Sequence, residues 1–261
     1  MSALFGDQAA LPVFEETPKI PLTMPIADFG PGPMPVDPIP FNGSMSNRIL
    51  AALPGADLSR LLPFLESVSL NVQQQLNRYG ENVDYVYFPE TAVISHVYFL
   101  ADGSTASSSV VGNEGAVGLS AIFEGAPSWR WIEVTLPGSA FRAPIAAVKK
   151  EFHDGGALHH LLLSCMSKRL TQVSQRAVCN SCHELPQRLC TWLLMIHDRA
   201  RTQQLSLTQE MMAKHLGTRR ASVNAACTTL RENGVIDYRR GAVTILNRKK
   251  LEAVACECHR A

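Results

Sequence analysis

Cysteine and histidine side chains gather in two short stretches near the C-terminal end of the sequence. The first stretch has the pattern C-x2-C-H-x6-C, and the second closes the chain as C-x-C-H. Thiolate sulfur and imidazole nitrogen at such short spacing are possible ligands for zinc or an iron–sulfur cluster. The residues are Cys179, Cys182, His183 and Cys190 in the first stretch, and Cys256, Cys258 and His259 in the second.

The first stretch lacks a second cysteine pair at the usual zinc-finger spacing. Small buried or interfacial thiols are the commoner explanation for cysteines in a reduced protein. We therefore predict no bound metal or cofactor, and keep Cys179, Cys182, His183 and Cys190 as the metal candidates. A redox or metal switch between a long helix and the C-terminal module is the alternative.

Motifs of the common enzyme classes are missing from the sequence. It has no Gly-rich phosphate loop, no nucleophile elbow and no H-E-x-x-H. The run VGNEG at residues 111–115 has two glycines but is typical of a β-turn. We expect a protein that is not an enzyme.

The run LTQEMMAKHLGTRRASVNAACTTL, from residue 207, predicts two helices joined by a glycine corner. The Thr208 hydroxyl can cap the first helix, and Gly217 can supply the left-handed conformation that ends it. The second helix is expected to run to about Glu232. Its predicted buried stripe consists of Val223, Ala226, Cys227 and Leu230.

The opposite face of this second helix carries side chains that suit the major groove of DNA. Arginine can bind guanine in bidentate fashion, asparagine matches adenine, and serine or threonine suits a phosphate or a base edge. Two β-like runs follow around a basic turn, whose arginines would contact phosphate. The predicted DNA-binding residues are Thr208, Arg219, Arg220, Ser222, Asn224, Thr228, Arg239 and Arg240. A packed helical hairpin with a solvated arginine face is the alternative.

Charge and composition favour a nucleic-acid partner for the C-terminal part only. From residue 184 onward, 13 Lys and Arg stand against 7 Asp and Glu, whereas the whole chain has a formal net charge of +1. Such a basic module indicates a polyanionic partner. Seven cysteines without framework spacing, no secretory signal and no bilayer-length apolar run predict a soluble cytoplasmic protein without a membrane partner.

Composition and hydrophobic pattern divide the sequence into four regions, which together predict an α+β fold. Residues 1–45 are rich in proline and predict a disordered tail. Residues 46–155 hold short alternating runs, such as VDYVYFPE, AVISHVYFL, TASSSVV and WIEVTL, and predict a compact β-roll. Residues 156–182 predict one long helix, and residues 183–261 predict a winged helix-turn-helix domain.

The long helix carries an apolar seam with 3-4-3-4 spacing over about two heptads. This seam predicts a dimer interface that the attached domains brace. A core helix that packs inside its own subunit is the alternative. The seam residues are Leu163, Met166, Leu170, Val173 and Ala177.

The predicted β-roll, long helix and winged helix-turn-helix, in this order along the chain, resemble the Crp/Fnr family of transcription regulators over about residues 47–258. The matching runs are YVYFPE, VGNEGAVGL, the long helix, and LTQEMMAKHLGTRRASV followed by ENGVIDYRRG. The resemblance implies a cyclic-nucleotide-binding-like sensor domain, a homodimer on an inverted-repeat DNA site, and RNA polymerase as a partner. It also gives the DNA-contacting role to Arg220, Ser222 and Asn224. Ala221 and Ala225 stand where the family often has glutamate and a second arginine, which implies a different half-site.

The predicted sensor domain departs from the cyclic-AMP-binding members of the family. Gly118-Leu119-Ser120 stands where those members have Gly-Glu-Leu, so the carboxylate that would bind the ribose is missing. Ser128 and Arg130 lie near the phosphate-binding Arg-Ser position, with the arginine about two residues out of register. We do not expect cyclic AMP to bind in the usual way, and keep these five residues as a pocket for an unknown effector. The alternative function is a small-ligand, redox or metal sensor whose winged module serves protein contacts.

Overall fold

The part of the chain that the computed structural model describes comprises residues 37–38, 45–100, 103–123, 128, 130–200 and 202–260. Most of the proline-rich tail predicted over residues 1–45 lies outside it. Two residues of that segment form a short strand instead of an unstructured tail. This strand, β1 (Asp37–Pro38), pairs antiparallel with β2, so that Asp37 lies opposite Ser69.

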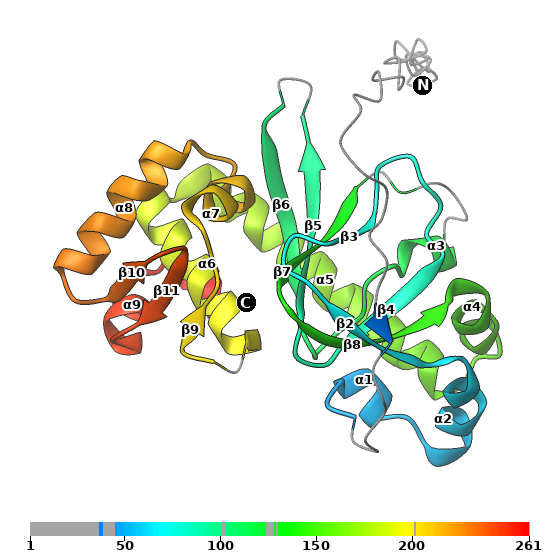
Figure 1. The fold of residues 1–261 in the computed structure, drawn as a ribbon. Coiled ribbons are helices and arrows are strands. Elements are labelled where there is room, and N and C mark those ends of the chain that lie inside the picture. The colour runs from blue at the N-terminus through cyan, green and yellow to red at the C-terminus, as the bar shows by residue number, and fades with distance from the viewer. Residues whose placement is uncertain are drawn as a thin grey trace, which may run out of the picture. The chain divides into compact units, whose positions relative to one another are not determined.

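Two four-stranded antiparallel sheets form the β-rich part of the chain (Figure 1). Their strand orders are β1-β2-β8-β4 and β3-β7-β5-β6. The four alternating runs quoted above are strands β4 to β7, so this prediction is confirmed. Apolar side chains from both sheets, such as Val68 and Ile132, pack into one core. The strand bounds are β2 Glu66–Leu70, β3 Gln75–Asn77, β4 Tyr85–Pro89, β5 Val93–Phe99, β6 Thr105–Val111, β7 Trp131–Leu136 and β8 Gly138–Pro144.

Short helices pack against the β-rich part and build a second core. Asn47 caps the first of them: its side-chain oxygen accepts from the backbone N–H groups of Ile49 and Leu50. Its amide nitrogen donates to the carbonyls of Pro89 and Gly115, both at 2.9 Å, so this buried side chain is fully used. The helices are α1 Arg48–Ala51, α2 Gly55–Leu61, η1 Leu62–Phe64, α3 Ser120–Phe123 and α4 Ile145–His153.

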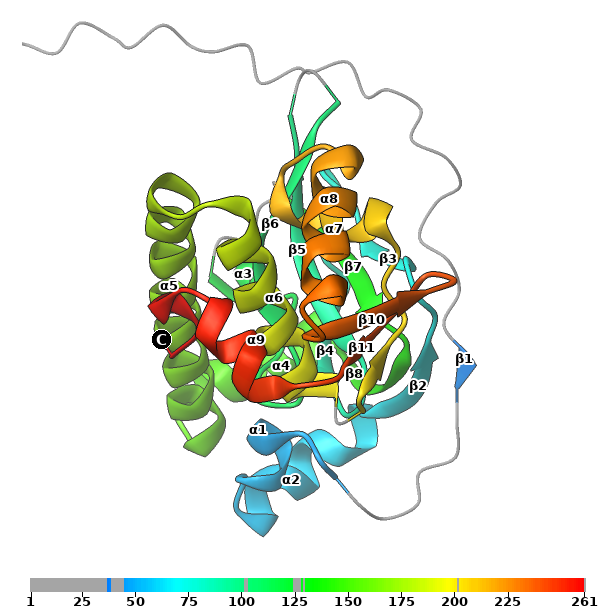
Figure 2. The same cartoon turned by 90° about the vertical axis from the view of Figure 1, so that its left-hand side faces the viewer.

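One long helix, α5 (Ala157–Cys182), has 26 residues and links the β-rich part to the C-terminal part (Figure 2). Its length confirms the predicted helix. Leu158 and Leu162 bury one face of it against the second core. The helix ends at His183, whose extended backbone turns the chain into the next helix.

The five residues of the predicted seam of α5 differ in how exposed they are. Met166 packs partly buried against the core of its own chain, and Val173 is also partly buried. By contrast, Leu163 is 43% exposed and Leu170 is 69% exposed, and Ala177 is exposed as well. The difference arises because the β-rich part already covers the inner side of the helix and leaves the outer members of the seam exposed.

The C-terminal part folds around a third core that includes Trp192 and Leu193 of α6 and the apolar stripe of α8. This core continues to Val93, Val110 and Leu136 of the β-rich part. A small antiparallel sheet of order β10-β11-β9 completes it. The elements are α6 Leu185–Ala200, β9 Gln204–Leu205, α7 Gln209–Leu216, α8 Arg220–Glu232, β10 Ile236–Arg239, β11 Ala242–Ile245, α9 Arg248–Val254 and η2 Glu257–Arg260. None of the helices in the described part of the chain has both the length and the apolar character that a bilayer crossing requires.

Candidate nucleic-acid interface

Helices α7 and α8 form the predicted pair around a glycine corner. The Thr208 hydroxyl accepts from the backbone N–H of Met211 at 3.1 Å, which makes it the N-cap of α7. Gly217 ends α7 with φ 62° and ψ 46°, a left-handed conformation that glycine adopts without a Cβ clash. Both predictions are confirmed.

Helix α8 buries one stripe and exposes a polar face. The buried residues are the four predicted ones. On the other side, Arg219, Arg220, Ser222 and Asn224 are exposed, and neither arginine has an ion-pair partner among the described residues. Thr228 is half-buried, and its hydroxyl donates to the backbone carbonyl of Asn224 at 3.0 Å. Thr228 therefore contributes less hydrogen-bonding capacity to this face than the other four.

Gln209, which was not among the predicted DNA-binding residues, orients the Asn224 side chain. The Gln209 amide nitrogen, in the first turn of α7, donates to the Asn224 side-chain oxygen at 2.8 Å. The backbone N–H of Gln209 also donates to the Tyr238 hydroxyl at 3.2 Å. Gln209 thus ties the exposed face of α8 to strand β10. A polar residue directly after the helix cap was the available signal.

Strands β10 and β11 form the predicted basic hairpin. Their two-residue turn consists of Arg240 (φ 49°) and Gly241 (φ 79°), as a type I′ turn requires. The Arg239 side chain is 82% exposed and pairs with Asp237 at 2.9 Å. A Cβ at Gly241 would lie 3.3 Å from the methyl group of Thr208, so the turn lies beside the N-cap of α7. The structure thus brings the basic turn, the α7 cap and the α8 face together in one module.

Polar contacts tie α7, and α6 beside it, to the β-rich part and α5 in the described part of the chain. Lys214 of α7 pairs at 2.5 Å with Glu133, whose side chain is only 3% exposed on β7. Further contacts are Thr105 Oγ1 to the Lys214 carbonyl at 3.4 Å, Arg176 Nη2 to the His215 carbonyl at 2.8 Å, and Arg199 of α6 to Glu114 at 2.7 Å. Because they come from β6, β7, α5 and the turn before α3, they restrict the module from several directions.

His215 of α7 is a buried, neutral ring. It is buried, stacks on Trp192 with ring centroids 5.2 Å apart, and has no hydrogen-bond partner for either ring nitrogen among the described residues. Burial, helped by the nearby charges of Arg176 and Lys214, lowers the pKa of His215 to about 3. An unfolded histidine has a pKa of about 6.5, so the unfolded chain takes up a proton first as the pH falls.

This burial predicts a pH-dependent stability that a single substitution removes. The contribution of neutral His215 is fully present above about pH 6.5 and is lost by about 1.4 kcal/mol per unit as the pH falls below it. Between pH 8 and pH 5, we expect the free energy of unfolding to fall by about 2 kcal/mol more in the unmodified chain than in His215→Leu. Urea unfolding at both pH values measures this. Equal falls in both proteins would contradict the buried neutral ring.

Backbone geometry, burial and a local hydrogen bond account for the positions of the residues predicted as a ligand pocket. Gly118 has φ 90°, and a Cβ there would lie 2.5 Å from the Tyr85 carbonyl oxygen. Leu119 is fully buried and Ser120 begins α3. The Ser128 hydroxyl donates to the Arg130 carbonyl at 2.8 Å. None of the five lines either of the two cavities described below.

The larger cavity, of about 320 Å³, lies between β6, the 112–115 turn and α5. Three cations line it, and of these Arg199 is paired with Glu114. The buried Arg169 guanidinium donates to the Ala116 carbonyl, while its Nη1 has no partner in the described part of the chain. The lining residues are Val110, Val111, Glu114, Gly115, Cys165, Lys168, Arg169, Thr171, Gln172 and Arg199.

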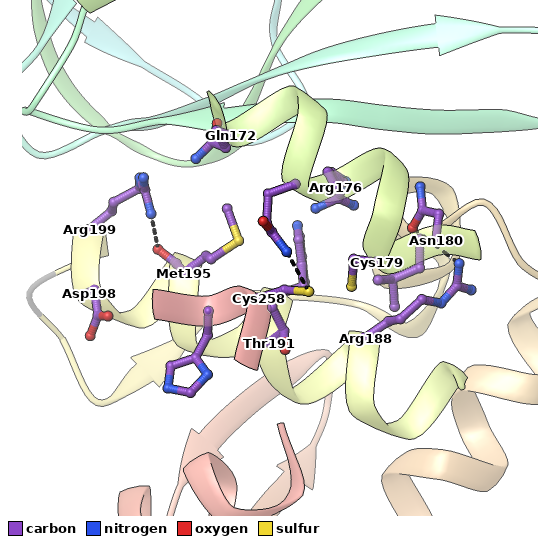
Figure 3. A pocket seen from close by; sticks show the side chains of 14 residues that line it. Gln172, Arg176, Cys179, Asn180, Arg188, Thr191, Met195, Asp198, Arg199 and Cys258 are labelled. Atoms are coloured by element: carbon purple, nitrogen blue, oxygen red, sulfur yellow. Dashed lines mark hydrogen bonds between the residues drawn. The ribbon is translucent and has the colours of Figure 1, made fainter. Parts of the chain in front are cut away.

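The smaller cavity, of about 80 Å³, lies where α5, α6 and η2 meet, and its lining side chains are drawn in Figure 3. Beside it the structure brings two of the four predicted metal candidates together with two other cysteines. Cys179 and His183 lie together with Cys256 and Cys258, whereas Cys182 is exposed and outside the group. Cys190 is buried outside the group, and burial raises the pKa of its thiol to about 12.

The comparison with known proteins agrees with this architecture. Residues 187–254 match the Crp-like helix-turn-helix domain family. No curated protein matches the chain in sequence. The fold is similar to that of a protein described as a transcriptional regulator of the Crp/Fnr family from Eubacterium rectale, with 18% identity and a TM-score of 0.64 over 82% of this chain and 98% of that one.

Two further solved structures are similar to nearly the same extent. The c-di-GMP-responsive global regulator CLP of Xanthomonas campestris has 14% identity and a TM-score of 0.63, covering 74% of this chain and 100% of its own. FixK2 of Bradyrhizobium japonicum has 17% identity and a TM-score of 0.63, covering 74% of this chain and 98% of its own. The chain therefore has the fold of Crp/Fnr family transcription regulators and carries a Crp-like helix-turn-helix domain.

Proposed function

We propose that this protein is a sequence-specific DNA-binding transcription regulator that acts as a homodimer on an inverted repeat. The main support is the exposed polar face of α8, which lies opposite the buried apolar stripe of that helix. Its residues are Arg219, Arg220, Ser222 and Asn224. Such a helix can enter the major groove while the core behind it stays intact. The basic turn at Arg239 and Arg240 would contact phosphate beside it.

In this proposal each region has one task. Residues 46–155 form the sensor domain, residues 156–182 the dimerisation helix, and residues 183–261 the DNA-binding domain. The protein works in the cytoplasm, and RNA polymerase is its protein partner once it is bound to DNA. The expected spacing between the two recognition helices is about 34 Å, one turn of the DNA helix.

The outer face of α5 supports the dimer. Leu163, Leu170 and Ala177 recur every seven residues and are exposed, and Val178 beside them is 53% exposed. Exposed apolar residues that recur at heptad spacing on a long helix are typical of a surface that another subunit covers. Met166 and Val173, which point partly into their own chain, would contribute at the edge of that contact.

Substitution of the most exposed seam residue is expected to separate the subunits. Leu170→Glu places a charge in the middle of the stripe, twice per dimer, and should raise the dimer dissociation constant by at least about 100-fold, which corresponds to about 2.7 kcal/mol. Sedimentation equilibrium measures it. Leu246→Glu is the matched control, because Leu246 is 59% exposed but lies outside α5. A dimer that withstands Leu170→Glu would place the interface elsewhere.

Selection of bound sequences from a random duplex library tests the proposal as a whole. The purified full chain should enrich a two-fold inverted repeat. Enrichment of a single unrepeated half-site would contradict the dimeric mode, and a failure to enrich any sequence, with or without small anions, would favour the sensing-only alternative.

The larger cavity supports an anionic effector. Its buried Arg169 and the adjacent Lys168 provide positive charge, and about 320 Å³ accommodates a small molecule. An effector there would touch α5 and the 112–115 turn, which holds Arg199 of the DNA-binding domain through Glu114. Binding could then favour one pose of the two DNA modules over another.

A further inference from the structure

Four cysteine and histidine side chains from two distant parts of the sequence meet beside the end of α5. Cys179 and His183 come from the C-terminal end of that helix, Cys256 immediately precedes η2, and Cys258 lies in η2. One ligand atom from each lies within 4.8 Å of the other three. Figure 3 shows Cys179 and Cys258 facing one another beside the small cavity.

Two of the six separations between these atoms match a tetrahedral ion, and the others are no longer than 4.8 Å. The Sγ atoms of Cys179 and Cys256 are 3.5 Å apart, and the Sγ atom of Cys258 is 3.6 Å from Nδ1 of His183. A tetrahedral zinc ion with bonds of about 2.3 Å to sulfur and about 2.0 Å to nitrogen places its ligand atoms roughly 3.4–3.8 Å apart. The described side chains would therefore need only small shifts to close around one ion.

The surroundings of the four ligands are those of a metal site. Nε2 of His183 lies 3.5 Å from a carboxylate oxygen of Glu257, which leaves Nδ1 directed at the sulfur atoms. Gln175 donates an amide N–H to Cys258 at 3.0 Å, and the Thr191 hydroxyl lies 3.0 Å from the Cys256 sulfur. A carboxylate behind the ligating histidine and donors to the sulfur atoms are the outer contacts that hold metal ligands in place.

We propose that Cys179, His183, Cys256 and Cys258 bind one zinc ion. Three thiolates and one imidazole, all from protein, form the closed set that is typical of structural zinc. The three cysteines are 2–8% exposed, so the ion would be shielded from solvent ligands. Binding releases the thiol protons to solvent, and no electron transfer is involved.

The site would join α5 to η2, which the Gln175–Cys258 hydrogen bond already links in the described part of the chain. It would fasten η2, at the end of the winged module, to α5, the proposed dimerisation helix. The ion would thereby restrict the angle between the DNA-binding domain and the dimer axis. This consequence rests on the proposed function, whereas the metal site itself does not.

Cobalt(II) is a suitable probe, because it replaces zinc in tetrahedral sites and gives visible spectra. The reduced, chelator-treated full chain should take up one Co²⁺ per chain, with the thiolate-to-cobalt charge-transfer band and intense visible bands of a tetrahedral site. Added Zn²⁺ should displace it. Cys258→Ala should weaken binding by more than about 100-fold, because removal of an outer hydrogen bond alone typically costs 10–100-fold.

Cys182→Ala is the matched control: Cys182 is exposed, lies three residues from Cys179 and is outside the ligand set. It should leave the spectrum and the stoichiometry unchanged. If Cys258→Ala does not fold, the spectrum of the unmodified chain still tests the ligand types. The proposal is overturned if the reduced chain binds no Co²⁺, if its spectrum lacks thiolate bands, or if Cys258→Ala binds as tightly as the unmodified chain.

A parallel DNA-binding assay with and without Zn²⁺ separates this proposal from the proposed function. Metal uptake by a chain that binds no DNA would support the zinc site and contradict the proposed DNA-binding function. DNA binding by a chain that takes up no metal would support the DNA-binding function and contradict the zinc site.

Discussion

Lys214→Met is expected to lower the free energy of unfolding by about 3–5 kcal/mol, the typical cost of leaving a buried charge without its partner. The Glu133 side chain is 3% exposed on β7, and Lys214 is the cation that pairs with it. The methionine side chain keeps most of the apolar stem of lysine and its preference for helix. The destabilisation therefore comes mainly from the unpaired carboxylate.

Urea unfolding measures the effect of Lys214→Met, with Lys249→Met as the control. Lys249 is exposed on α9 and forms no ion pair among the described residues. The double variant Lys214→Met with Glu133→Leu should recover most of the stability, because replacing both members of a buried pair is often nearly neutral. A destabilisation below about 1 kcal/mol in the single variant would mean that the pair behaves as a surface salt bridge.

Arg220→Ala is expected to weaken binding to the selected DNA site by about 2–6 kcal/mol for the dimer, because each half-site is weakened by about 1–3 kcal/mol. Arg220 is the first residue of α8, and the N-terminal residues of a recognition helix contact base edges. At the lower end this is about a 30-fold rise in the dissociation constant. Binding to random DNA should change much less.

Titration of selected and random duplexes at several salt concentrations distinguishes base contacts from phosphate contacts. Arg240→Asn should weaken both duplexes alike and reduce the salt slope by about 1 for each phosphate group that the variant no longer binds. Asparagine is the suitable replacement, because it tolerates the positive φ of 49° at this position. Arg231→Ala, at the far end of α8, is the control on the same helix. Equal weakening on both duplexes for Arg220→Ala would contradict its base-reading role.

Local signals account for the elements that could be predicted from the sequence. The α7 cap at Thr208, the glycine corner at Gly217 and the four-residue stripe of α8 all lie within one run of 24 residues, and the structure has each of them. Capping, left-handed glycine and a 3.6-residue period act between neighbours along the chain. The strands of the β-rich part and the length of α5 followed from similar short-range patterns.

Predictions that depended on which side of an element faces the rest of the chain were less complete. The seam of α5 is split, since Met166 turns inward while Leu170 points outward. The periodicity of a helix shows that a stripe exists, but not which neighbour covers it. Likewise, the cavity next to Arg169 formed away from the residues predicted to hold an effector.

The helix-turn-helix module, the long helix and the alternating strands could be predicted without the structure, because their signals are local. Which groups meet across the chain depends on how the elements pack. Lys214 and Glu133 are 81 residues apart, and Cys179 and Cys256 are 77 apart. Neither separation leaves a pattern along the chain, because such contacts depend on how α5, α6 and η2 pack after the local elements have formed. The cysteines near one another in sequence, Cys179 and Cys182, accordingly point to different surroundings on one helix, and the four-residue group exists only in the folded chain.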